Sequence, residues 1–327
     1  MRLPRPLPPY FHPTAVILVD DNYRFSAAVR ASAPDDLVLT TYLSPEQALH
    51  EVNQPHPRDA LVDMCFSSDG FGLQLDLDVL EEEIKRPDRF DRLAVVLVDY
   101  SMPTLGGLEF CAAVEDRDIR RVLLTGVREE KTAVAAFNER LIEHYLPKTK
   151  LTAPSDLHAY IEEQQHRYFQ AFLTRITTSL GIRPPEFTTN AGFLDYFESI
   201  VLAEQIVEFY LVTNPWGYLL LTAEGKTLQV IVQDQKSKAE VEEIVDKFNA
   251  PEGIQQKVRS GAEMLCLFEH PNDYLGDEPF PWQELTFEAK QVDKHLWCTL
   301  VRDPPLDIDF DPQSTCYAQH LKRYRQR

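Results

Sequence analysis

Residues 93–108, with the sequence LAVVLVDYSMPTLGGL, decide the fold of the first half of this chain. An apolar, largely β-branched run ends abruptly at Asp99, and such a run is typical of a parallel strand buried on both faces. Open α/β sheets place their chemistry at the carboxyl ends of their strands, so Asp99 is a candidate functional residue. The loop that follows contains Ser101, Met102, Pro103, Gly106 and Gly107.

Three other apolar runs, AVILVDDN, RVLLTG and EHYLPK, also end in polar residues. They supply, in chain order, Asp20, Asp21, Thr125 and Lys148. Clustered carboxylates raise one another's pKa values, and a hard cation such as Mg²⁺ relieves their repulsion. A hydroxyl and an ammonium at the same edge suit the oxygens of a phosphoryl group. The four strand ends together predict a site for Mg²⁺ and a phosphoryl group.

In this order the motifs resemble those of one protein family. Residues 14 to about 160 are similar to the receiver domain of two-component response regulators. The resemblance implies a flavodoxin-like (βα)5 fold with a five-stranded parallel sheet. Taken singly, each residue has a plainer explanation, such as an acid that caps a helix. A receiver fold that is never phosphorylated is the alternative for the whole set.

The resemblance also implies a role for each residue. Asp99 accepts a phosphoryl group from a histidine kinase or a phosphotransfer protein. Asp21, Asp99 and the backbone carbonyl of Ser101 hold Mg²⁺, and Asp20 assists through water. The phosphoryl oxygens are bound by Thr125 and Lys148. Tyr145 matches the aromatic residue whose rotamer reports phosphorylation.

Two departures from the family pattern stand out. Pro147 precedes Lys148, whereas the family usually has proline after this lysine. An insertion of about residues 54–92 separates an expected helix from the Asp99 strand. It contains Asp63 in LVDMCF, which we reject as the acceptor because no Met–Pro continuation follows. The insertion is expected to face away from Asp99, either as a lobe that docks a partner or as a solvated decoration.

Length and composition limit the possible classes of protein. At 327 residues two domains are expected, and the net charge of −19 makes nucleic acid and anionic membranes poor partners. The five cysteines form no close pair, so neither a disulfide framework nor a zinc site is indicated. No signal peptide or membrane span is evident, and a cytoplasmic location is expected.

The chain is expected to divide into a proline-rich tail (1–13), a receiver domain (14–153), a long connecting helix (154–181) and a C-terminal α+β domain (186–327). The helix keeps an apolar stripe beyond the length that a receiver needs, and Gly181 ends it. One hypothesis is that its copy pairs with it in a homodimer, through Phe172 and Ile176. The alternative is that the C-terminal domain packs on this stripe.

The C-terminal half shows mixed helix and strand patterns and no recognisable output motif. Helices are predicted at 191–207, 237–249 and 254–268, the last with a possible strand at its end, and strands at 208–213, 217–222, 228–233, 285–291 and 295–301. An interaction or ligand-binding domain is the favoured reading. DNA binding is an alternative that the acidic charge disfavours, although the tail 321–327 is basic.

A nucleotidyltransferase-like enzyme is a further alternative for this half. The sequence LDIDFDP places Asp307, Asp309 and Asp311 on one face of an extended segment, where they could hold Mg²⁺. The small-residue signal of such enzymes is missing upstream. An acidic edge strand that discourages aggregation explains the same pattern.

Overall fold

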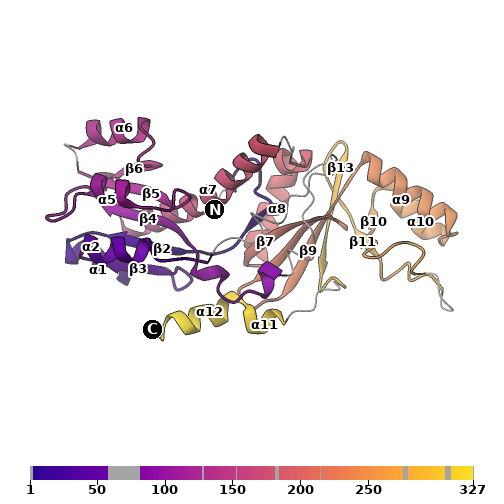
Figure 1. Cartoon of the computed structure of the whole chain (residues 1–327). Helices are drawn as coiled ribbons and strands as arrows, with labels where there is room; N and C mark the ends of the chain where they lie inside the picture. The colour runs from indigo at the N-terminus through magenta and orange to yellow at the C-terminus, as the bar shows by residue number, and fades with distance from the viewer. Residues whose placement is uncertain are drawn as a thin grey trace.

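The computed structural model describes residues 3–57, 82–126, 129–151, 153–180, 184–213, 215–274, 279–305 and 311–326. Two sheets form the two halves of the molecule, and Figure 1 shows them side by side, joined by a long helix. The five-stranded sheet has the order β3-β2-β4-β5-β6 with every pair parallel. Its strands are β2 (Ala15–Val19), β3 (Leu39–Tyr42), β4 (Leu93–Asp99), β5 (Arg120–Thr125) and β6 (His144–Pro147). The predicted α/β fold is confirmed.

Strand β4 lies at the centre of this sheet, and all seven of its residues are buried. Val96 and Val98 belong to one apolar cluster, whereas Val95 and Leu97 belong to another. Because a strand alternates its side chains, helices must cover both faces of the sheet, which explains the unbroken apolar run. One face is covered by α2 (Pro45–Val52), α5 (Gly107–Ala113) and α6 (Glu130–Asn138), and the other by α1 (Tyr23–Ala31) and α7 (Pro154–Leu180).

The second sheet is antiparallel and has the order β1-β7-β8-β9-β13-β12. Its strands are β1 (Tyr10–Phe11), β7 (Ile206–Thr213), β8 (Trp216–Thr222), β9 (Thr227–Asp234), β12 (Lys290–Asp293) and β13 (Leu296–Arg302). Helix α8 (Ala191–Ala203) packs on this sheet. A lobe beyond it contains α9 (Gln235–Lys247), α10 (Glu252–Ser260), β10 (Glu263–Leu265) and β11 (Thr286–Glu288). The predicted α+β architecture of this half is confirmed.

Some predicted boundaries in this half need correction. The predicted helix at 254–268 ends at Ser260, because Gly261 adopts a left-handed conformation with φ of 74° and caps it. Strand β10 follows it, within the last part of the predicted segment. The predicted strand at 285–291 is divided between β11 and β12, which pair with different strands.

The prediction of a tail over 1–13 is wrong for the described residues 3–13. Strand β1 pairs with β7, and Leu7 and Tyr10 are each 1% exposed within the core of the second sheet. Proline suits an extended segment at a sheet edge, where one side of the backbone needs no partner. The apolar residues between the prolines therefore complete the core of a domain that lies far away in sequence.

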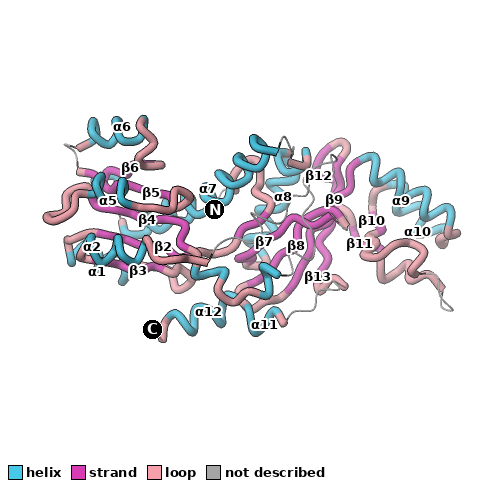
Figure 2. The backbone as a smooth tube through the Cα atoms, viewed as in Figure 1, coloured by secondary structure: helices cyan, strands magenta, loops and turns pink. Residues whose placement is uncertain are grey.

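Helix α7 runs from the parallel sheet to the antiparallel one, as Figure 2 shows. Leu157 and Ile161 pack in the core around the parallel sheet, which we call the first core. Phe169 packs in the core of the antiparallel sheet, the second core. Leu173 is also buried. The predicted helix is confirmed, and packing within the chain accounts for these four side chains. The side chains of Phe172 and Ile176 lie outside the described residues.

The C-terminal helix α12 (Tyr317–Tyr324) returns to the first half of the chain. Tyr317 packs with Val38 and Phe90, and the Tyr324 hydroxyl lies 3.2 Å from Oγ1 of Thr40 on strand β3. Arg325 donates a hydrogen bond of 2.7 Å to the carbonyl of Asp35. The basic tail is thus engaged by an acidic loop of the same chain. A short helix, α11 (Pro312–Thr315), precedes α12.

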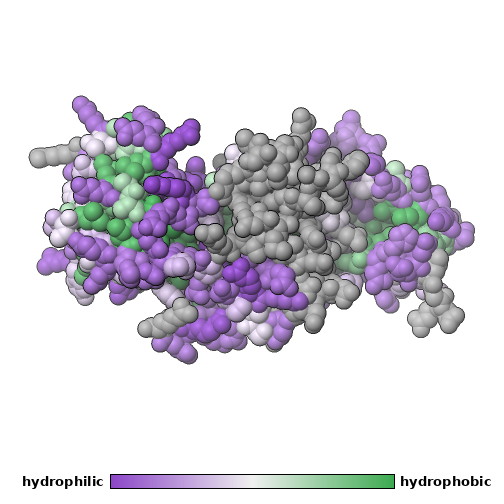
Figure 3. Space-filling view, in the orientation of Figure 1, coloured by the Kyte–Doolittle hydropathy of each residue, from purple (hydrophilic) through white to green (hydrophobic). Residues whose placement is uncertain are grey.

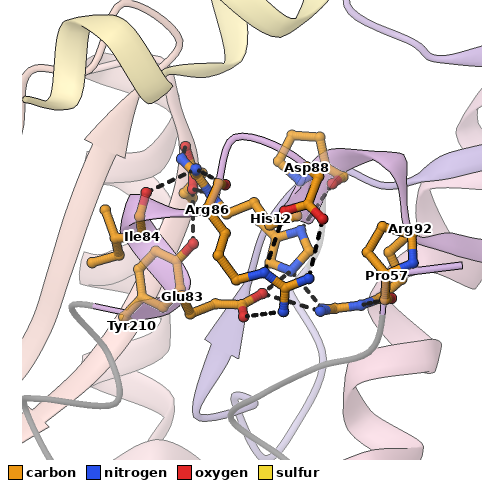
Figure 4. A network of polar contacts seen from close by, with 11 residues as sticks. His12, Pro57, Glu83, Ile84, Arg86, Asp88, Arg92 and Tyr210 are labelled. Atoms are coloured by element: carbon orange, nitrogen blue, oxygen red, sulfur yellow. Dashed lines mark hydrogen bonds and ion pairs between the residues drawn. The ribbon is translucent and has the colours of Figure 1, made fainter.

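Charged residues are buried where the two halves meet, at the amino end of β4. The Arg89 guanidinium forms two hydrogen bonds of 3.0 Å to the Glu208 carboxylate on β7, and both side chains are 0% exposed. Arg92 donates to Glu83 at 3.0 Å and to Nε2 of His12 at 2.8 Å (Figure 4). We call these five residues the junction cluster.

The described part of the insertion, 54–57 and 82–92, thus includes residues at the end of β4 opposite Asp99, in line with the expected orientation. Residues 58–81, which include Asp63, lie outside the described part. No helix within the described ranges is long and apolar enough to cross a bilayer.

Candidate functional site

Four neighbouring strands of the parallel sheet end at one edge, and each end carries a polar residue. Asp20 follows β2, Asp99 ends β4, Thr125 ends β5 and Lys148 follows β6. The register pairs Val19 with Val98 and Thr125 with Pro147, so the ends are level. The order β2-β4-β5-β6 therefore brings together residues that span most of the first half of the sequence.

Lys148 makes the central contacts of this site. Its Nζ lies 2.7 Å from Oδ2 of Asp20 and 2.8 Å from Oδ1 of Asp99. The Asp20 side chain is 0% exposed and that of Asp99 11%, whereas the lysine side chain is 26% exposed. One ammonium thus bridges two carboxylates that are almost withdrawn from water.

Asp21 adds a third carboxylate to the site, and no ion pair to it is seen within the described part of the chain. Carboxylate oxygens of Asp20, Asp21 and Asp99 all lie within 4.8 Å of one another, and Asp21 is exposed. Lys148 is the one cation among the described residues with an ion pair to Asp20 or Asp99. Three carboxylates and one ammonium leave two negative charges. Oxygen donors in this number and charge suit a hard divalent cation.

The pKa values of the site reflect this imbalance. Burial raises the pKa of Asp99, the charges of Asp20 and Asp21 raise it further, and Lys148 opposes the rise. For Lys148, burial lowers the pKa, but its hydrogen bonds to the two aspartates outweigh this and the net direction is upward. The lysine therefore stays charged, and additional positive charge near Asp99 would favour its ionised form.

Thr125 supplies a second indication of a ligand. The residue is 0% exposed, and its hydroxyl oxygen has no hydrogen-bond partner among the described residues. An unsatisfied buried hydroxyl is unfavourable, because it has lost its bonds to water and gained none. A ligand oxygen bound at the strand ends would satisfy it.

The loop after Asp99 is held close to the strand by a glycine. A Cβ added to Gly107 would lie 2.3 Å from the Asp99 carbonyl oxygen, so no larger residue fits. The Gly107 amide donates to the Tyr100 carbonyl at 3.1 Å, and Met102 is buried against the core. Ser101, two residues after Asp99, is exposed.

Helix α1 contributes residues that the sequence reasoning did not single out. Asn22 caps the helix, and its backbone amide donates to Oδ1 of Asp20 at 2.9 Å. Ser26 donates to the Asp20 carbonyl at 3.2 Å. The Phe25 ring lies with its centroid 4.9 Å from Nζ of Lys148. A capping signal could have found Asn22, but no sequence signal connects Phe25 to a residue on another strand.

The remaining predicted site residues are the switch aromatic Tyr145 and the acids of the C-terminal half. Tyr145 lies on β6, half-buried against the first core and paired in register with Leu123. Asp307 and Asp309 lie outside the described residues. Asp311 is exposed, and its carbonyl accepts a hydrogen bond from the Ser314 amide at 3.1 Å.

Comparison with solved structures shows that the chain is similar to a response regulator over nearly its whole length. The response regulator LqsR from Legionella pneumophila superposes with a TM-score of 0.79 at 25% sequence identity, over 97% of this chain and 96% of that one. A receiver domain protein from Clostridium thermocellum covers 47% of this chain at 18% identity, with a TM-score of 0.30.

An adenylate cyclase from Rhodopirellula baltica covers 51% of the chain at 20% identity, with a TM-score of 0.36. No protein-family model and no curated protein matches the chain. The parallel-sheet half thus has the fold of response regulator receiver domains, and the similarity to LqsR extends through the C-terminal half.

Proposed function

We propose that this chain, whose first half has a receiver fold, is a phosphorylated response regulator with Asp99 as the acceptor. The observation that carries the proposal is the contact of Lys148 with both Asp20 and Asp99, at the same sheet edge as the Thr125 hydroxyl, which has no partner within the described ranges. A domain that kept the fold without the chemistry would have no need for an unbalanced acid cluster at this edge. The receiver domain spans residues 14–153 in this proposal.

The chemistry is a transfer between two protein side chains. A carboxylate oxygen of Asp99 attacks the phosphorus of a phosphohistidine on the kinase or phosphotransfer protein. The P–N bond breaks, its electron pair stays on the imidazole, and an acyl phosphate forms on Asp99. Such transfers depend on positioning and charge neutralisation. Lys148 can supply positive charge to a phosphoryl oxygen, and Thr125 can donate its idle hydrogen bond to another.

The acid cluster fits Mg²⁺. Asp20, Asp21 and Asp99 offer oxygens at mutual distances suited to one ion, and the Ser101 carbonyl is a fourth candidate ligand. When bound, the ion supplies positive charge to the transferring group. Asp20 also keeps Lys148 in place, so its carboxylate serves both as an acid of the cluster and as an anchor for the ammonium.

The signal passes from the site to the rest of the molecule through groups that a phosphoryl group attracts. An acyl phosphate adds negative charge and acceptor oxygens, and Thr125 and Lys148 can move toward them. Tyr145 lies three residues before Lys148 on the same segment and acts as the switch aromatic. Helix α7 contacts both cores and carries the change to the C-terminal domain, residues 186–327.

The proposed partners follow from the same site and from exposed apolar residues. A histidine kinase or phosphotransfer protein delivers the phosphoryl group in the cytoplasm. A homodimer would form through α7, with Phe172 and Ile176 at its interface. Val134 and Phe137 on α6 are 39% and 45% exposed, and Figure 3 shows apolar surface on the parallel-sheet half. These residues offer further area for such contacts.

The C-terminal half is proposed to bind a protein or small ligand rather than to catalyse a reaction. An enzymatic output through Asp307, Asp309 and Asp311 is the alternative, and so is DNA binding. The hydrogen bond from Arg325 to the Asp35 carbonyl occupies part of the basic tail, which disfavours DNA binding through that tail.

Intact-mass spectrometry tests the proposal. The full chain is incubated with acetyl phosphate and Mg²⁺, and a gain of about 80 Da is expected, the mass of one phosphoryl group. Asp99→Asn should abolish the gain. Asp63→Asn, which alters the sequence look-alike in the insertion, is the matched control and should retain it. No gain in the wild type, or a gain that survives Asp99→Asn, would overturn the proposal.

A further inference from the structure

The Phe25 ring lies against the lysine of the site, on a helix that no sequence motif links to it. Its centroid is 4.9 Å from the Lys148 ammonium, within the range of a cation–π contact. Among the described residues the ammonium therefore contacts two carboxylates and one aromatic face. Only the aromatic face carries no formal charge and makes no directional bond.

The ring is held in place from two sides. The Phe25 amide donates to the Asn22 side chain at 3.3 Å in the helix cap, and the ring packs against the core between the sheet, α1 and α7. The lysine is less constrained. Lys148 begins a short 3-10 turn, Lys148–Lys150, and its side chain is 26% exposed, so among the described residues its ammonium is positioned by the two carboxylates and the Phe25 ring.

We infer that Phe25 is a positioning residue for Lys148, keeping the ammonium at the strand ends while it moves between the aspartates and an incoming phosphoryl group. This inference rests on the proposed function of the site. A carboxylate binds the ammonium along a defined direction, so leaving it loses a bond. A ring face attracts a cation over a broad area, so the ammonium can pivot across it while remaining in contact.

The inference predicts a specific loss of function. Replacing the ring with an aliphatic side chain of similar bulk should preserve the core but remove the attraction. Phe25→Leu should therefore weaken binding of beryllofluoride, a mimic of the phosphoryl group, by roughly three- to ten-fold in the presence of Mg²⁺. Phosphorylation by acetyl phosphate should slow by a similar factor. Phe25→Tyr keeps an aromatic face and should restore most of both.

A double-mutant cycle separates positioning from packing. The dissociation constant for beryllofluoride is measured by fluorescence in the wild type, Phe25→Leu, Lys148→Ala and the double variant, all as full chains. If Phe25 acts through Lys148, its substitution should have little further effect once the lysine is gone. Phe280→Leu, in the lobe that contains α9 and α10, is the matched control for the same chemical change, and circular dichroism checks the fold of each variant.

The outcomes distinguish this inference from the proposal beneath it. A wild type that gains no mass with acetyl phosphate overturns the proposed function and this inference together. A wild type that is phosphorylated, with Phe25→Leu unchanged or equally damaging in both lysine backgrounds, overturns only the inference. If Phe25→Leu does not fold, Phe25→Met replaces it. Phe25→Tyr should then bind beryllofluoride more tightly than Phe25→Met, and equal binding would contradict a role for the aromatic ring.

Discussion

Strand β4 has a charged cluster at each end, and the two clusters are built in opposite ways. At its amino end the junction cluster is fully buried, and its two arginines match its two glutamates. At its carboxyl end the strand-end cluster, Asp20, Asp21, Asp99 and Lys148, is partly exposed and carries excess negative charge. Acidic and basic side chains therefore serve different purposes at the two ends of one strand.

The difference lies in how completely each cluster is satisfied. A buried charge is tolerated when it is paired and hydrogen-bonded, and the bidentate Arg89–Glu208 contact meets this condition, with a further hydrogen bond of 2.7 Å from the Tyr210 hydroxyl to Glu208. Removing either Arg89 or Glu208 would leave the other charge buried without its counterion. The strand-end cluster has three acids and one base, and the Thr125 hydroxyl at a neighbouring strand end has no hydrogen-bond partner among the described residues, so a bound ligand would satisfy groups that the fold leaves unsatisfied.

The largest expected effect is at the junction cluster. Glu208→Gln leaves the Arg89 charge buried without its counterion and should lower the free energy of unfolding by roughly 3–5 kcal/mol. Urea denaturation measures this loss. Lys148→Met makes a comparable change at the more exposed cluster and should cost less. Equal losses at the two sites would contradict the comparison.

Magnesium should stabilise the protein through the strand-end cluster and not through the junction cluster. At a concentration about 100 times its dissociation constant, Mg²⁺ bound to the folded state should stabilise it by about 2.7 kcal/mol. Thermal melting of the wild type with and without MgCl₂ shows the shift, with NaCl at equal ionic strength as the control. Asp99→Asn should remove the shift, whereas Glu208→Gln should keep it. A shift that survives Asp99→Asn would place the ion elsewhere.

A pH effect should report the junction cluster. Burial, followed by the charge of Arg92, holds the pKa of His12 well below its ordinary value of 6.5. Below pH 6.5 the His12 imidazole is protonated in the unfolded chain but stays neutral in the folded chain. The free energy of unfolding should therefore fall as the pH drops below 6.5, by up to about 1.4 kcal/mol per pH unit. His12→Gln should flatten this part of the stability profile. An unchanged slope would show that His12 does not contribute.

The smallest effect is expected for an exposed pair with the same charges. Glu163 and Arg167 form an ion pair at 2.7 Å on α7, with side chains 52% and 53% exposed. Because water and salt screen such a pair, Glu163→Gln should change the free energy of unfolding by no more than about 0.5 kcal/mol. A loss as large as that of Glu208→Gln would show that burial does not govern the difference.

The strand-end residues could be predicted because each belongs to a local pattern. Asp20, Asp99 and Thr125 each end an apolar run, and parallel strands bring such ends to one edge of the sheet. Phe25 gave no such signal, since its contact with Lys148 joins elements far apart in sequence. The Arg89–Glu208 pair, 119 residues apart, could not be predicted for the same reason.

The two termini show where local patterns end. Periodicity and turn residues were enough to predict the parallel sheet, helix α7 and most elements of the antiparallel sheet, because these patterns reflect which faces of an element are buried. They could not show that β1 completes the second sheet or that α12 rests on the first half. Those placements depend on complementary surfaces that exist only after both halves have folded, so no stretch of sequence records them alone.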